Sequence, residues 1–433
     1  MSAFRIHGGQ PLQGAITPQG TKNEALQVIC AVLVTSSPIT IHNIPDILDV
    51  QKLLALLKVL GVRITNPAKG TYHFDPSHLV AVETDILKEH ATKIRGAIMI
   101  MGPLLARLGK VIVHSPGGDR IGRRRLDTHF LGVSKLGATF SYDDKEGAYL
   151  VEAKALQGNY ILLDEASVTG TANLIMAACL AQGTTTLYNA ACEPHIQQLC
   201  KMLVQMGAQI DGIGSNLLTI HGVQELKGTT HTIAPDIIEI GSFIGLAAMT
   251  MADLTIKDAQ VAQLGPILST FRKMGIQVEV KGDNLIIPRQ KHYEIEKELN
   301  NALLTIADAP WPGFPADLLS IMLVVAIQAK GTLLIHQKMF ESRLFFVDKL
   351  IEMGAQVVLC DPHRASVTGL DRAYPLRGIR MSSPDIRAGI ALLIAALSAK
   401  GTSIIENIDQ IDRGYELIDT RLRSLGAAIE RID

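Results

Sequence analysis

The sequence predicts an α/β protein of two similar domains, each built from three copies of one folding unit. A Leu/Met-Gly signature recurs six times, and a β-rich run recurs six times about half a period earlier. The chain of 433 residues is also too long for one compact core and fits two domains of ordinary size. Hydrophobic residues make up 47% and charged residues 19%, so most of the chain can bury a core instead of remaining disordered.

The first repeated signature joins a helical pattern to a strand pattern through Leu or Met, Gly, and a small or β-branched residue. Successive glycines are 76, 70, 68, 79 and 72 residues apart. Each glycine is expected just past a helix end, where the left-handed conformation favours a residue without Cβ. The alternative is an ordinary doubly wound α/β protein with coincidental glycines. The six copies are Leu60-Gly61-Val62, Leu136-Gly137-Ala138, Met206-Gly207-Ala208, Met274-Gly275-Ile276, Met353-Gly354-Ala355 and Leu425-Gly426-Ala427.

The second signature is a turn followed by a β-rich run, typified by Gly183–Leu187 and Gly331–Ile335. An Ala-rich apolar helix precedes most copies, such as Leu174–Leu180 and Ala388–Leu397. Because such a helix is apolar nearly all round, it should be buried on every side. Each folding unit is therefore predicted as strand, buried helix, strand, amphipathic helix, strand. Two domains imply a cleft between them, where small-molecule sites usually lie.

Charge and composition exclude several classes of protein. The 41 basic and 42 acidic residues nearly cancel, which argues against nucleic-acid and membrane-surface partners. The five cysteines form no CxxC pair, as expected in a reducing compartment. We find no secretory signal pattern, and the longest apolar runs, Leu318–Ile327 and Ala388–Leu397, are too short to cross a bilayer. We therefore expect a cytoplasmic protein.

The sharpest local motif is the Gly/Arg loop from Pro116 to Asp127. Three glycines and a proline predict a mobile tip, and four arginines within six residues suit a phosphate or carboxylate. The loop lacks the GKS or GKT ending of a Walker motif. A solvated basic turn is the alternative, although the glycines and the embedded Asp119 speak against it.

A second motif, Thr21-Lys22-Asn23-Glu24, opens an apolar helical run. Thr21 can cap this helix, and a helix N-terminus favours bound anions. Lys22 could neutralise a phosphate or, with a lowered pKa, donate a proton. By itself the motif fits a plain capped helix equally well.

Three further loops place charged residues near helix starts. Asp317 ends a Pro-rich loop ahead of an apolar helix, where it could simply cap that helix. Ser383–Arg387 and Gln410–Tyr415 each pair an Asp with an Arg, for which a surface salt bridge is the default interpretation. The loop Met339–Arg343 adds another arginine. The 13 histidines show no metal-ligand spacing, so neither a metal nor a cofactor is expected.

Together these motifs resemble the enolpyruvyl transferases, most closely the members that act on UDP-N-acetylglucosamine. The resemblance implies a pair of inside-out α/β barrels with three units each. It implies one domain at residues 22–235, a second at 1–21 and 236–433, and an active site in the cleft between them. It covers essentially the whole chain, through Gly20-Thr21-Lys22-Asn23, Arg95 before Gly102-Pro103, the Pro-Gly-Gly loop, Asp127-Thr128-His129, Ser167-Val168-Thr169-Gly170, Asn189-Ala190-Ala191 with Glu193-Pro194, Phe314–Asp317, Asp385-Ile386-Arg387 and Ile411–Tyr415.

The activity implied by the resemblance is transfer of the enolpyruvyl group of phosphoenolpyruvate to the 3-hydroxyl of UDP-N-acetylglucosamine, with release of phosphate. This is the first committed step of peptidoglycan precursor synthesis. Asp317 is implied as the base, Asp119 or Lys22 as the proton donor, and Lys22, Arg124 and Arg413 as the groups around phosphoenolpyruvate. The residues implied to bind substrate or to close over it also include Asn23, Arg95, Arg125, Leu126, Asp127, Thr128, Glu165, Ala166, Ser167, Val168, Thr169, Met339, Arg343, Asp385 and Arg387.

The sequence departs from the family at three positions. Asp119 stands where many members carry a loop cysteine, the residue that fosfomycin alkylates. A carboxylate is a far poorer nucleophile toward an epoxide, so we predict resistance to fosfomycin. Glu165 and Ile237 stand where members often have Lys and Arg. Two other functions stay open: transfer to shikimate 3-phosphate, and a non-catalytic sensor of the sugar nucleotide.

Overall fold

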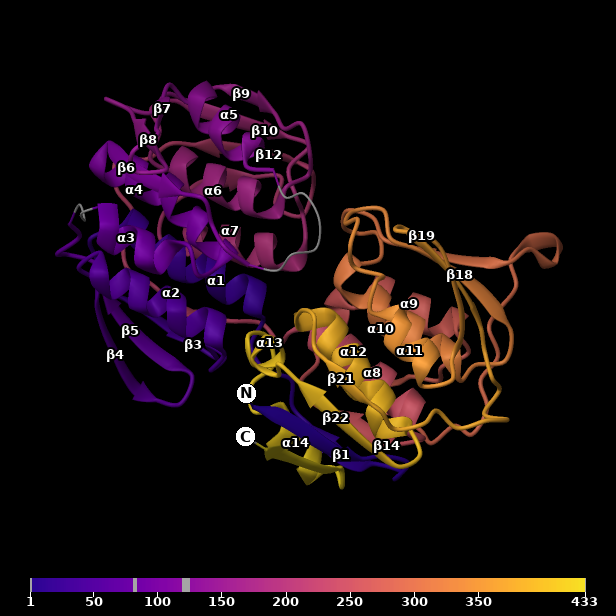
Figure 1. The fold of residues 1–433 in the computed structure, drawn as a ribbon. Helices are drawn as coiled ribbons and strands as arrows, with labels where there is room; N and C mark the ends of the chain where they lie inside the picture. The colour runs from indigo at the N-terminus through magenta and orange to yellow at the C-terminus, as the bar shows by residue number, and fades with distance from the viewer. Residues whose placement is uncertain (1, 81–83, 119–124, 433) are drawn as a thin grey trace. The chain divides into compact units, whose positions relative to one another are not determined.

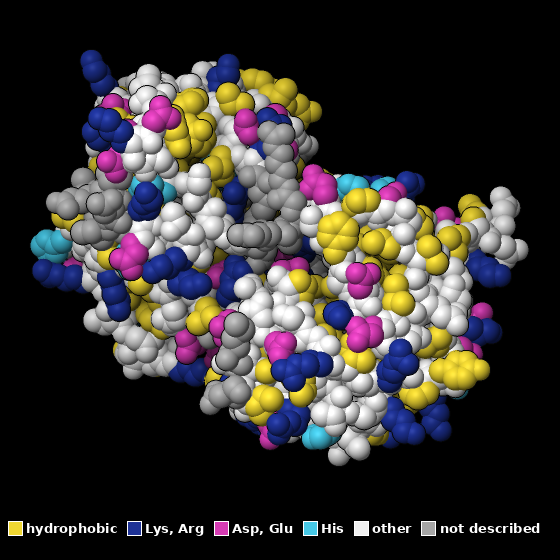
Figure 2. All heavy atoms as spheres, viewed as in Figure 1, with side chains coloured by type: hydrophobic (Ala, Val, Ile, Leu, Met, Phe, Trp, Pro, Cys, Tyr) yellow, Lys and Arg dark blue, Asp and Glu magenta, His cyan; other side chains and the backbone are white. Residues whose placement is uncertain are grey.

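The computed structural model describes residues 2–80, 84–118 and 125–432, and its contacts divide them into two compact lobes (Figure 1). Among these residues, lobe 1 comprises 2–19 and 235–432, and lobe 2 comprises 20–80, 84–118 and 125–234. Asp119 and Arg124, two of the predicted site residues, lie outside the described residues. On the face shown in Figure 2, basic and acidic side chains are interspersed over each lobe, in keeping with the near-zero net charge.

In lobe 1, three buried helices pack against one another: α8 (Ile237–Thr250), α10 (Leu319–Ile327) and α12 (Ile386–Ser398). Every residue of α8 and α10 is buried, as the Ala- and Leu-rich sequence predicted. The outer helices are α9 (Gly265–Lys273), α11 (Val347–Glu352), α13 (Asp409–Asp412) and α14 (Ile418–Ser424), and short 3₁₀ helices span Val261–Gln263, Leu299–Asn301 and η5 (Ala316–Leu318).

Three four-stranded sheets surround these helices, and each packs on one of them. In strand order they are β15 (Glu279–Lys281), β16 (Asn284–Ile287), β14 (Asp253–Ile256) and β2 (Gln13–Ile16); β17 (Leu304–Ala307), β18 (Thr332–His336), β20 (Arg364–Thr368) and β19 (Gln356–Asp361); and β21 (Arg380–Ser382), β22 (Thr402–Glu406), β1 (Ala3–His7) and β23 (Ala428–Ile432).

Lobe 2 repeats this plan with α1 (Lys22–Ala31), α4 (Met101–Leu108) and α6 (Val168–Ala178) inside. The remaining helices are α2 (Leu48–Val59), α3 (Thr84–Ala91), α5 (Asp127–Lys135) and α7 (Pro194–Gln205), with 3₁₀ helices at Val32–Val34 and η2 (Arg95–Ile100). The sheets of the described residues, in strand order, are β13 (Thr230–Thr232), β3 (Ile39–His42), β5 (Thr71–Asp75) and β4 (Arg63–Ala68); β6 (Lys110–His114), β8 (Ala148–Glu152) and β7 (Thr139–Asp143); and β11 (Gln209–Asp211), β12 (Leu217–His221), β10 (Thr184–Tyr188) and β9 (Tyr160–Leu162).

The predicted number of strands per unit was wrong. In five of the six sheets of the described residues, the strand that follows the buried helix has a parallel neighbour on one side, and an antiparallel pair of strands such as β20 and β19 completes the sheet on the other. Some strands come from distant sequence: β1 completes the sheet of β22 and β23, and β13 pairs with β3. Strand alternation identifies a strand but not its partner, which explains why the sequence could not show these exchanges.

The six signature glycines confirm the repeat. All have φ between 80° and 106°, in the left-handed region, two residues beyond the end of a helix. The fold predicted from the sequence, an inside-out α/β architecture with three repeats in each lobe, is therefore confirmed. In the described part of the chain, no helix combines the length and apolar character needed to span a bilayer.

Candidate active site

In lobe 1 the carboxylate of Asp317 is held between two arginines. Its Oδ1 lies 2.7 Å from Nη1 of Arg343, and its Oδ2 lies 3.0 Å from both Nε and Nη2 of Arg387. Asp317 stands in η5, just before α10, and its side chain does not cap the helix as the sequence allowed. It keeps 23% of its side-chain surface exposed, so the carboxylate remains accessible to a ligand.

Arg387 is fixed by a hydrogen-bonded chain in the interior of lobe 1. Its Nη1 donates to the hydroxyl of Tyr415 at 3.3 Å, and that hydroxyl lies 3.0 Å from Oγ of Ser242 on α8. Burial alone would lower the pKa of Arg387, but the charges of Asp317 and its neighbours outweigh burial and raise it. Arg387 is therefore a permanent cation at the N-terminal end of α12.

The N-termini of the three inner helices of lobe 1 lie close together. Asp236 caps α8 and Asp385 caps α12, each accepting two backbone N–H groups. The predicted Asp-Arg surface pairs were wrong: Arg387 binds Asp317, Asp412 binds Arg431, and Arg413 donates to Oε1 of Gln410 at 2.8 Å.

The loop around Met339 is shaped by Asp308, a fully buried residue that the sequence analysis did not select. Its carboxylate accepts from Nε2 of Gln337 at 2.6 Å and from the backbone N–H of Met339 at 3.1 Å. The Met339 side chain is 43% exposed. A guanidinium–ring contact of 4.7 Å between Arg343 and Phe340 places this loop beside Asp317.

In lobe 2, Lys22 is the first residue of α1 and pairs with a residue that the sequence analysis missed. Its Nζ lies 2.7 Å from Oδ2 of Asp49 on α2, and their side chains are only 8% and 5% exposed. Thr21 occupies the N-cap position of α1, as predicted, but its side chain makes no capping hydrogen bond to the helix; its hydroxyl donates to the backbone oxygen of Ala234 instead. Asn23 is partly exposed beside Lys22.

A second group of predicted residues in lobe 2 meets around Asp164. Nη2 of Arg125 lies 3.6 Å from Oδ2 of Asp164, and the hydroxyl of Thr128 donates to Oδ1 at 2.7 Å. Nε of Arg125 donates to Asp127, and Nη2 of Arg95 donates to the backbone oxygen of Arg125. The hydrogen bond to Asp127 raises the pKa of Arg125. Leu126 precedes α5 directly.

The segment from Glu165 to Thr169 starts α6, and Ser167 is its N-cap, accepting from the N–H of Gly170. Thr169 contacts the buried ring of His129, whose other nitrogen accepts from Asn173 at 2.8 Å. Burial, with the charge of Arg95 second, lowers the pKa of His129 to about 3, so the ring is neutral. Glu165 lies 3.5 Å from the Thr128 hydroxyl, and Ala166 and Val168 are partly exposed.

The predicted residues thus gather around Asp317 in lobe 1, and around Lys22 and around Asp164 in lobe 2. Asp49, Asp164 and Asp308 were missed because the role of each depends on a contact with a residue distant in sequence. The described residues hold no group of three or more His, Cys, Asp or Glu that could bind a metal.

Comparison with known proteins shows the family to which the chain belongs. The model of the EPSP synthase (3-phosphoshikimate 1-carboxyvinyltransferase) family matches residues 6–422. The chain belongs to this family. Its members are transferases, and the chain is accordingly an enzyme that acts on small molecules.

Two curated relatives match the chain along its full length. It is 59% identical over 434 residues to UDP-N-acetylglucosamine 1-carboxyvinyltransferase of Bacteroides thetaiotaomicron, and 58% identical over 434 residues to the protein of the same name from Porphyromonas gingivalis. Both alignments cover 100% of this chain and 100% of the relative.

Solved structures of the family share the fold at lower identity. The enolpyruvyl transferase NikO from Streptomyces tendae superimposes with a TM-score of 0.87 at 24% identity, covering 99% of this chain and 98% of that one. EPSP synthase from Acinetobacter baumannii gives a TM-score of 0.75 at 16% identity, with 100% of both chains covered. At these identities the likeness supports the fold alone.

Proposed function

We propose that this enzyme transfers the enolpyruvyl group of phosphoenolpyruvate to the 3-hydroxyl of UDP-N-acetylglucosamine and releases phosphate, in the cytoplasm. The observation that carries the proposal is the match over the full length, at 59% and 58% identity, to two enzymes of that name. The side-chain geometry supports it, because each lobe gathers the charged groups that addition and elimination require.

Addition begins when a base takes the proton of the sugar 3-hydroxyl, and we assign this role to Asp317. Arg343 and Arg387 fix both oxygens of its carboxylate, and a general base must be held in position in this way. The sugar oxygen then bonds to C2 of phosphoenolpyruvate while an acid protonates C3. Elimination removes a proton from C3 and expels phosphate, restoring the carbon–carbon double bond in the product.

Phosphoenolpyruvate carries a phosphate and a carboxylate, so its site must be cationic. We assign Lys22, Arg124 and Arg413 to this substrate. The ion pair with Asp49 holds the Lys22 ammonium at the N-terminal end of α1, an end that also favours anions.

For the sugar nucleotide we propose Asn23, Arg95, Arg125 to Thr128 and Glu165 to Thr169, together with Met339, Arg343, Asp385 and Arg387. The contacts around Asp164 support the lobe 2 part of this set, because they orient Arg125 and Thr128 beside the start of α6. The groups of both lobes are proposed to act on one pair of substrates.

The proton donor is either Asp119 or Lys22. A carboxyl group serves as an acid near neutral pH only with a raised pKa, and the arginines beside Asp119 in the sequence oppose that. Comparing Asp119→Ala with Lys22→Ala separates the two, because loss of the donor should lower kcat by about 10²–10⁴-fold.

A phosphate-release assay with each acceptor tests the proposed function. We expect phosphate release from phosphoenolpyruvate with UDP-N-acetylglucosamine and none above background with shikimate 3-phosphate. Phosphate release with shikimate 3-phosphate but not with UDP-N-acetylglucosamine would show instead that the enzyme transfers the enolpyruvyl group to shikimate 3-phosphate. Tight binding of the sugar nucleotide without phosphate release at any pH would instead indicate a sensor.

A further inference from the structure

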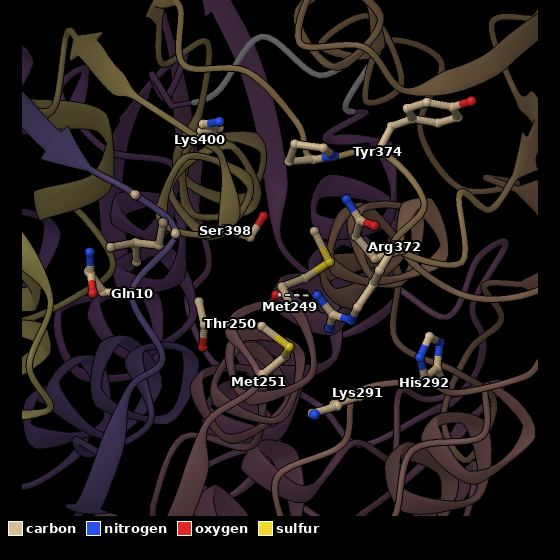
Figure 3. A pocket seen from close by; sticks show the side chains of 15 residues that line it. Gln10, Met249, Thr250, Met251, Lys291, His292, Arg372, Tyr374, Ser398 and Lys400 are labelled. Carbon is tan, nitrogen blue, oxygen red and sulfur yellow. Dashed lines mark hydrogen bonds between the residues drawn. The ribbon is translucent and has the colours of Figure 1, made fainter.

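Lobe 1 contains a pocket of about 630 Å³, at the opposite ends of its inner helices from Asp317 and Arg387. Met249 and Thr250 end α8, Gln328 follows α10, and Leu397 and Ser398 end α12; all five line the pocket (Figure 3). Because α8 has 14 residues, the two ends of the helix layer are roughly 20 Å apart. None of the residues assigned to catalysis or substrate binding lines this pocket.

Cationic side chains from three different segments surround the pocket. Lys291 follows β16, Lys400 follows α12, and Arg372 lies in the turn after β20, as Figure 3 shows. Lys291 and Lys400 are exposed to solvent. His292 also lines the pocket and already faces Asp371, with Nδ1 and Oδ1 3.0 Å apart. Among the described lining residues none is acidic, so the pocket favours an anion.

Arg372 makes this end of the helix layer compatible with an anion. The carbonyls at a helix C-terminus carry partial negative charge, which would repel one. The guanidinium of Arg372 covers them at α8, donating to the backbone oxygens of Ala248 and, at 3.2 Å, Met249. Its Nε, although buried, has no hydrogen-bond partner in the described part of the chain.

The remaining wall fits a ring-bearing ligand with polar substituents. Gln328 is 3% exposed, and its buried Oε1 is without a hydrogen-bond partner among the described residues. Rotation of the amide exchanges its oxygen and nitrogen, so the side chain can offer a donor or an acceptor. Met251 and Leu397 add apolar surface, and Tyr374, 70% exposed, presents a ring for stacking.

We propose that this pocket binds a phosphate-bearing metabolite of nucleotide size, at a site separate from the catalytic groups. Lys291, Lys400 and Arg372 would receive the phosphates, and Tyr374 and Gln328 would contact the ring and its polar groups. The volume lies in the range of about 300–1,000 Å³ typical of small-molecule sites. Such a ligand would not compete with the substrates for their contacts.

Isothermal titration calorimetry of the full chain saturated with UDP-N-acetylglucosamine tests this proposal, with ATP, pyrophosphate and adenosine as probes. We expect ATP and pyrophosphate to bind one per chain and adenosine to bind far more weakly. The double variant Lys291→Glu/Lys400→Glu should raise the Kd for ATP at least tenfold. The control Lys281→Glu/Lys297→Glu, which makes the same charge change at two exposed lysines outside the pocket, should leave it unchanged.

Three results would overturn the proposal: no binding of any probe at several millimolar, adenosine binding as tightly as ATP, or an equal Kd in the two double variants. The deciding readout is the difference in Kd between the two double variants, which can also be measured without UDP-N-acetylglucosamine, so it does not depend on whether the proposed enolpyruvyl transfer is correct. Circular dichroism and thermal melting of both variants establish that each one folds.

Discussion

The buried ion pair between Lys22 and Asp49 offers a prediction whose size follows from the structure. Nζ and Oδ2 are 2.7 Å apart, and the side chains are 8% and 5% exposed. With an effective dielectric constant of about 20, Coulomb attraction at this distance is about 6 kcal/mol. Asp49→Asn removes the charge and leaves the ammonium buried, a change that typically costs about 3–5 kcal/mol.

Hydrogen exchange followed by mass spectrometry measures this effect locally, which suits a chain of two lobes better than a single melting curve. Asparagine keeps one acceptor oxygen, so we expect the lower figure, about 3 kcal/mol. That corresponds to roughly 100-fold faster exchange in peptides from α1 and α2 if these helices open as a unit with lobe 2. Peptides of lobe 1 should exchange at the original rate.

Asp46→Asn is the matched control, because Asp46 lies three residues away and its side chain is exposed. We expect it to change stability by less than about 0.5 kcal/mol. If Asp49→Asn exchanged no faster than Asp46→Asn, the ion pair would not stabilise α1, and the argument that Asp49 positions Lys22 would fail. Asp49→Asn should also lower kcat/KM for phosphate release.

Four further predictions concern single residues. The pKa of His129 is about 3 in the folded chain, against 6.5 for an ordinary histidine, so only the unfolded chain binds the extra proton between these pH values. Stability should therefore fall as pH drops through this window, by up to about 1.4 kcal/mol per pH unit from this group, and His129→Gln should lack that contribution. Fosfomycin should cause no time-dependent inactivation, whereas Asp119→Cys should become sensitive; a mass-spectrometric adduct on Asp119 would refute this. Burial raises the pKa of the Cys30 thiol, so iodoacetamide should modify the exposed Cys360 first and Cys30 only after unfolding; equal labelling rates would contradict the structure. Asp317→Asn should lower kcat for phosphate release by about 10²–10⁴-fold, and near-normal turnover would exclude Asp317 as the base.

The repeat was predictable because it depends on local physics. A glycine with positive φ past a helix end, such as Gly354, can be recognised from the residues next to it. An all-apolar helix such as α10 can be recognised in the same way, from one run of consecutive residues. The second strand after each amphipathic helix has a sequence pattern that is harder to recognise. β20, for example, is a short alternating segment directly after a turn, and the predicted unit did not include such a strand.

The contacts within the candidate site were not predictable in this way. Arg387 and Asp317 are 70 residues apart, and nothing in either motif indicates that they pair with each other instead of with a sequence neighbour. The same holds for Asp49 and Lys22, which are joined only by the packing of α2 against α1. A motif supplies the residue types of a site, whereas tertiary packing selects their partners.

The central claim is that the enzyme joins the three-carbon unit of phosphoenolpyruvate to the sugar nucleotide. The most direct test is mass spectrometry of the reaction products together with measurement of free phosphate. We expect the enolpyruvyl ether of UDP-N-acetylglucosamine, with one phosphate released for each ether formed. Phosphate release without the ether, or recovery of both substrates unchanged from an enzyme that binds them, would contradict it.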